Sequence, residues 1–172
     1  MPTTAQLRKI WLLSDTVLYP EAAAFLRRLV RDQNCKPLPT SQVAGLLNIA
    51  EAYQYDELST FVIHQRDRNW PPRQRDIKTF YTALAETLVE MEKRLSDDFH
   101  LVASARKGPS QRGPEEYELL ALLAREFIQH LIAENILLAA KEDDERRQQR
   151  PPARADQHTQ QRPGQQHRPD RR

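Results

Sequence analysis

The residues best suited to chemistry in this chain lie between Ile63 and Lys78, in the stretch IHQRDRNWPPRQRDIK. Five basic side chains, one histidine and one tryptophan occur there: Arg66, Arg68, Arg73, Arg75, Lys78, His64 and Trp70. Guanidinium groups hold phosphates through paired hydrogen bonds, and aromatic rings stack on bases. The stretch therefore predicts a nucleic-acid-binding site, and no catalytic motif of comparable density occurs elsewhere in the sequence.

Several of these side chains allow two interpretations from sequence alone. Trp70 either stacks on a base or fills the junction between the helices on either side of it. The arginines either bind a ligand or form a solvated surface with Asp67 and Asp76 as ion-pair partners. Cations at a helix start are disfavoured by the helix dipole, so a functional role is favoured for Arg73 and Arg75.

Catalytic chemistry has weaker support in the sequence. His64, beside Arg66 and Arg68, has the residue type for general acid–base cleavage of RNA, but a second histidine is missing nearby. Cys35 has no patterned His or Asn partner and is interpreted as an incidental loop cysteine. No glycine-rich phosphate-binding loop is present. We therefore predict no catalytic residues and no enzyme.

The pattern of metal-ligating and apolar residues predicts neither a metal site, nor a cofactor, nor a membrane partner. Glu126 and His130 are four residues apart and can meet on a helix, but such pairs are common on charged helices. One cysteine cannot form a disulfide within the chain or a zinc site of several thiolates, and it is compatible with a reducing cytoplasm, the predicted location. The N-terminus is interpreted as a helix rather than a signal peptide, and no stretch approaches the length of a membrane span.

The elements that must position the basic stretch are predicted to be helices. Strong helix formers dominate, aromatic residues make up only 7 % and there are four glycines, which favours an all-α fold. Apolar residues at three- and four-residue steps predict a bundle of five or six helices, near residues 3–13, 20–34, 40–52, 56–69, 76–95 and from 114 onward. The first is predicted to be interrupted at Ser14 or Asp15, and Trp70-Pro71-Pro72 to end the fourth.

The charge distribution separates a body from a tail. The net charge is +2, but from Arg146 onward the chain has eight Arg and two Asp, while the preceding residues have 18 basic and 22 acidic side chains. We predict a helical bundle domain over residues 1–148 and a disordered Arg/Gln/Pro-rich tail over 149–172, because the tail lacks apolar residues. The tail either adds phosphate affinity or only increases solubility. The body itself is mildly acidic, so any binding surface must be local.

A stretch in the first two thirds of the chain supports a family resemblance. A helix begins at Leu38-Pro39-Thr40-Ser41-Gln42, and a basic helix end is later followed by a long helix with Phe80, Tyr81, Leu84 and Leu88. Over roughly residues 38–95 this pattern resembles the small all-helical subunit of type III CRISPR effector complexes. The resemblance implies a non-catalytic role in antiviral defence, beside a guide–target duplex. It also implies that the five basic side chains contact the nucleic-acid backbone.

These observations predict a non-catalytic, RNA-binding structural subunit of a ribonucleoprotein effector complex. The predicted partners are RNA, as a guide–target duplex or a single strand, and other subunits of the complex. The alternative is a helical protein–protein adaptor that self-associates through its C-terminal apolar helix. That alternative depends on the segment from Leu119 to Leu138, which carries more apolar side chains than one buried face requires.

Overall fold

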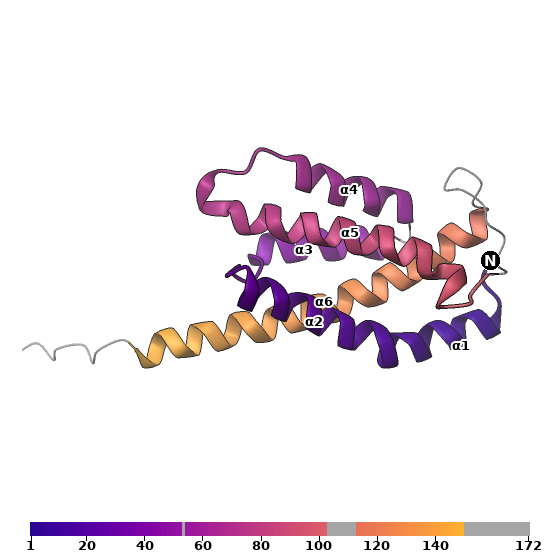
Figure 1. Cartoon of the computed structure of the whole chain (residues 1–172), viewed down its shortest axis with the longest axis horizontal. Helices are drawn as coiled ribbons and strands as arrows, with labels where there is room; N and C mark the ends of the chain where they lie inside the picture. Colours follow the sequence, from indigo (N-terminus) through magenta and orange to yellow (C-terminus); the bar gives the residue numbers. More distant parts are fainter. Residues whose placement is uncertain (53, 103–112, 150–172) are drawn as a thin grey trace, which may run out of the picture.

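All regular structure in the described part of the chain is helical. The computed structural model describes residues 1–52, 54–102 and 113–149. Six α-helices occur in this order: α1 (Thr4–Leu13), α2 (Tyr19–Asp32), α3 (Thr40–Glu51), α4 (Tyr55–Asp67), α5 (Arg75–Asp97) and α6 (Pro114–Gln148). A π-helical segment, Ser14–Leu18, joins α1 to α2, and a short 3-10 turn, Pro72–Gln74, precedes α5. No strand occurs in these ranges, which confirms the predicted all-α helical bundle (Figure 1).

The first two helices begin where their sequences predict. The Thr3 hydroxyl accepts a hydrogen bond from the amide of Gln6 at 3.3 Å, and the Gln6 side chain accepts one from the amide of Thr3 at 2.7 Å. This reciprocal capping box satisfies two amides that the helix start leaves unpaired. Pro20 and Glu21 lie in the first turn of α2, where proline costs no hydrogen bond and an acidic residue complements the helix dipole.

The predicted interruption at Ser14 or Asp15 is a change of helix type, because α1 ends at Leu13 and the π-helical segment then carries the chain into α2 without a loop. The amide of Ser14 still donates to the carbonyl of Ile10. The Ser14 hydroxyl is buried and lies 3.0 Å from the carboxylate of Glu126 and 2.8 Å from Nε2 of His130. Two side chains of α6 therefore satisfy a serine whose type alone indicated a helix end.

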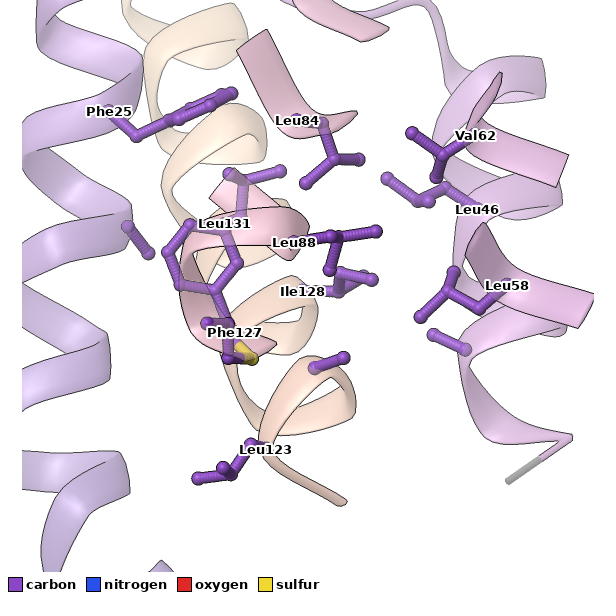
Figure 2. Packing of buried hydrophobic residues seen from close by; sticks show 14 of the residues in the cluster. Phe25, Leu46, Leu58, Val62, Leu84, Leu88, Leu123, Phe127, Ile128 and Leu131 are labelled. Atoms are coloured by element: carbon purple, nitrogen blue, oxygen red, sulfur yellow. The ribbon is translucent and has the colours of Figure 1, made fainter. Parts of the chain in front are cut away.

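Helix α6 lies in the middle of the bundle, in contact with α2, α3, α4 and α5. Its ten buried residues extend from Leu119 to Asn135. Phe25 of α2 meets Phe127 of α6 edge to face with ring centroids 6.1 Å apart, in the core shown in Figure 2. Burying such a side chain contributes roughly 2 kcal/mol. The excess of apolar residues on this helix is therefore used inside the bundle as far as Ile132.

A buried asparagine fixes the loop between α2 and α3. The side chain of Asn135 accepts a hydrogen bond from the amide of Leu38 at 2.7 Å and donates to its carbonyl at 3.2 Å. This pairing satisfies both backbone groups of a buried loop residue. Cys35, predicted to be an incidental loop cysteine, does lie in this loop but is buried in the core, and burial raises the pKa of its thiol.

Two predicted segments lie largely outside the described residues. The predicted disordered tail, residues 149–172, has only its first residue within the described part, directly after the end of α6. The polar loop expected before Pro114 falls mostly on residues 103–112, which are likewise not described.

Candidate nucleic-acid interface

The basic stretch forms the connector between α4 and α5, at one end of the bundle, the left end in Figure 1. Helix α4 was predicted to continue to Asn69 but ends at Asp67, because Arg68 already has an extended backbone with φ −61° and ψ 141°. Pro71 is extended as well, and the chain then turns into α5. The α4–α5 connector, defined here as residues 64–78, therefore presents its basic side chains from two helix ends and an extended segment.

Trp70 lies at the junction between the two helices. Its indole nitrogen donates a hydrogen bond of 2.7 Å to the carbonyl of Gln65, in the last turn of α4. Such carbonyls have no partner within the helix, so the indole satisfies a group that the helix end leaves unpaired. The ring packs against the core, and the guanidinium carbon of Arg68 lies 4.6 Å from its centroid. This geometry matches the junction-filling interpretation of Trp70 and holds Arg68 through a cation–π contact.

The two acidic residues of the connector behave differently. Arg66 donates two hydrogen bonds to the carboxylate of Asp67, at 2.7 and 2.9 Å, and this pairing lowers the pKa of Asp67. Asp76, the second partner in the solvated-surface interpretation, instead accepts a hydrogen bond of 3.4 Å from the amide of Lys36. Among the described residues, Arg66 is thus the one arginine of the connector that forms an ion pair with a carboxylate.

Three cations of the connector have no side-chain partner among the described residues. Arg73, Arg75 and Lys78 are exposed, and none forms an ion pair or side-chain hydrogen bond within the described part of the chain. They lie around the N-terminal end of α5, where the partial positive charge of the helix dipole makes cations unfavourable. An anionic ligand would relieve this repulsion and could also use the unpaired amides of the helix start.

His64 is exposed in the last turn of α4, and its ring has no hydrogen bond within the described ranges. Lys78 and then His64 add to the effect of Arg66 in lowering the pKa of Asp67, so the last turn of α4 and the first turn of α5 lie within electrostatic reach of each other. The connector thus contains every predicted site residue, and Arg66, Arg68 and Trp70 among them are engaged by neighbouring protein groups.

Two polar features were not predicted from the sequence. Lys36 of the α2–α3 loop is exposed and lies beside the start of α5 through its amide contact with Asp76. No local signal indicates this neighbour, because it is forty residues away in the chain. The second is the hydroxyl of Ser14, which lies within hydrogen-bond distance of both Glu126 and His130.

Comparisons of the chain with protein-family models, with curated proteins and with solved structures find no match. Within residues 1–52, 54–102 and 113–149, no three His, Cys, Asp or Glu side chains are grouped so that they could hold a metal ion. In the same ranges, none of the helices has the length and apolar character needed to cross a membrane.

Proposed function

We propose that this protein is a non-catalytic RNA-binding subunit of a ribonucleoprotein complex, and that the α4–α5 connector contacts the RNA backbone. The observation that carries the proposal is the set of three exposed, unpaired cations around the start of α5. Arg75, the first residue of α5, lies where the helix dipole disfavours a cation. A role in binding phosphate accounts for the presence of the three cations, and the resemblance to small subunits of type III CRISPR effector complexes supports RNA as the ligand.

The geometry favours contact with phosphates over contact with bases. Sequence-tolerant binding of single strands uses exposed aromatic rings on which bases stack. The indole ring of Trp70, the largest ring of the connector, packs against the core and lies under Arg68. Backbone contacts made by Arg73, Arg75 and Lys78 position an RNA without reading its sequence. This mode suits a complex in which base pairing supplies the specificity.

The proposal is tested with the full-length variant Arg73→Ala/Arg75→Ala/Lys78→Ala. We expect its affinity for an RNA duplex to fall at least about tenfold at low salt, because three phosphate contacts are lost. The slope of log affinity against log salt should decrease in magnitude by about two to three. Fluorescence anisotropy with a labelled duplex over a series of salt concentrations measures both quantities.

A matched control removes the same charge elsewhere, in the variant Arg8→Ala/Arg28→Ala/Lys93→Ala. These residues lie on α1, α2 and the later turns of α5, outside the connector. The control should keep the wild-type affinity and salt slope. Equal losses in the two variants would show that bulk charge, or the basic tail, carries the binding and would reject the connector as the site.

A second candidate function is an adaptor that self-associates through α6. One observation favours it: Ile136 and Leu137 are 57 % and 64 % exposed, directly beyond the buried part of the helix. Replacing both with Asp should then convert an oligomer to a monomer in sedimentation velocity. A wild-type protein that stays monomeric at high concentration would remove this candidate.

A further inference from the structure

A groove lies between α2 and the second half of α6, away from the connector. It encloses about 640 Å³. Its floor is mainly apolar, with Tyr19, Ala23 and Val30 on α2 and Leu138 on α6. Tyr19 is 47 % exposed in this groove. Exposed tyrosines are often anchor residues of protein interfaces.

The two walls of the groove carry opposite charge. The α2 wall contributes Arg27 and Arg31, and the α6 wall contributes Glu134, Glu142 and Glu145. The α6 wall also contains one cation, Lys141. No ion pair crosses the groove among the described residues; Glu142 instead pairs with Arg146 of its own helix at 3.2 Å.

The two helices run in the same direction along the groove, both from right to left in Figure 1. The ring of Tyr19 lies edge-on to that of His130, with centroids 5.4 Å apart. Twelve residues further along each helix are Arg31 and Glu142, so these two side chains stand at about the same height on opposite walls.

We propose that this groove face is the contact surface of a homodimer, in which α2 of one copy lies against α6 of the other. A two-fold axis that runs along the groove places the α2 wall of one copy opposite the α6 wall of the other. This rotation leaves the position of each residue along the axis unchanged. It places Arg31 of each copy level with Glu142 of the other, and Arg27 at a height between Glu134 and Glu142. A closed dimer requires a patch that complements itself, and one cationic row beside one acidic row meets this requirement.

The size of the surface sets the expected strength of the dimer. The α2 side of the groove, from Tyr19 to Arg31, is about 18 Å long. Two helices of that length offer less than the roughly 800 Å² that each partner contributes to a standard stable interface. We therefore expect a weak, reversible dimer that forms in the micromolar range, weakens with added salt and depends on the charge rows for its geometry.

The test uses two charge-reversal variants of the full-length chain and sedimentation velocity over a range of concentrations. The α2 variant is Arg27→Glu/Arg31→Glu, and the α6 variant is Glu142→Arg/Glu145→Arg. Each should self-associate at least about tenfold more weakly than wild type, because both copies of the contact become repulsive. An equimolar mixture of the two should dimerise again, because every contact between the walls then joins opposite charges.

Arg28→Glu is the control, because Arg28 lies on α2 outside the groove, 6.0 Å from the ring of Phe25. It should dimerise as wild type does, and circular dichroism should show that all variants are folded. A monomeric wild type, a dimer that survives either reversal, or a mixture that stays monomeric would overturn the proposal. A dimer lost in Ile136→Asp/Leu137→Asp but kept in the α2 variant would assign self-association to the other face of α6.

Discussion

The two ends of α5 both carry arginine, but the side chains are used in different ways. Near the C-terminal end, Arg94 donates two hydrogen bonds of 2.9 Å to Glu21 and one of 2.9 Å to Asp98. Its guanidinium carbon also lies 4.5 Å from the ring centroid of Phe99. At the N-terminal end, Arg73 and Arg75 have no such partner among the described residues.

The two ends of α5 differ in whether their arginines have partners within the described part of the protein. Arg94 connects α5 to α2, sits where the helix dipole favours a cation, and has its pKa raised by the hydrogen bonds to Glu21. Arg75 opposes the dipole, and its guanidinium forms no ion pair or hydrogen bond among the described residues. The proposed RNA contact would account for a cation at this position.

The largest expected effect is at the structural end. Arg94→Ala should lower the free energy of unfolding by about 2 to 3 kcal/mol, because it leaves Glu21 and Asp98 without their shared partner. Arg94→Lys should lose less, since it keeps the charge but not the planar fork. Urea unfolding measures both, and RNA affinity should be unchanged. A loss below about 0.5 kcal/mol would mean that the two ends are equivalent.

Tyr81 is a buried residue of α5, and its titration should not depend on the arginines at either end of the helix. Burial raises the pKa of Tyr81 to about 12, above its ordinary value of 10.0. The unfolded chain therefore releases this proton first, so stability should fall by about 2 kcal/mol as pH rises from 10 to 12. Comparison of wild type with Tyr81→Phe isolates this slope in thermal unfolding at several pH values. Identical slopes would show that Tyr81 titrates normally.

Trp70 variants measure how much the packing of the connector against the core contributes to stability. Trp70→Ala should lower the free energy of unfolding by about 2 kcal/mol, because packing and the hydrogen bond to Gln65 are both lost. Trp70→Phe should recover part of this through packing alone. Chemical denaturation of both variants checks the ordering. Unchanged stability of Trp70→Ala with weakened RNA binding would instead assign the ring to base stacking.

The smallest expected change in the free energy of unfolding is that of Arg75→Glu, and its sign distinguishes a structural from a ligand-binding role. Arg75→Glu replaces a cation with an anion in the first turn of α5 and should raise the free energy of unfolding by about 0.5 kcal/mol. The same change should weaken RNA binding in fluorescence anisotropy. Arg75→Gln should show half of each effect. A loss of stability on either change would indicate a structural role for Arg75 and would remove the contrast between the two ends.

Local patterns were sufficient for the helices themselves. The period of the apolar residues predicted six helical segments, which correspond to α1 to α6. The pattern did not predict how two of these helices end. Ser14 begins a π-helical segment, with its hydroxyl bonded to Glu126 of α6, and α4 ends at Asp67, where Trp70 bonds back to Gln65.

The sequence alone determined the all-α class, the basic connector and its seven candidate residues, because propensity, periodicity and composition are local properties. Only the tertiary structure decided which cations are available. Arg66 is paired with a neighbour, Arg94 is held by another helix, and Asp76 is turned toward Lys36. The charge rows of the α2–α6 groove likewise exist only once the two helices lie side by side. Charge pairing depends on distance in space, and the order of residues along the chain does not specify that distance.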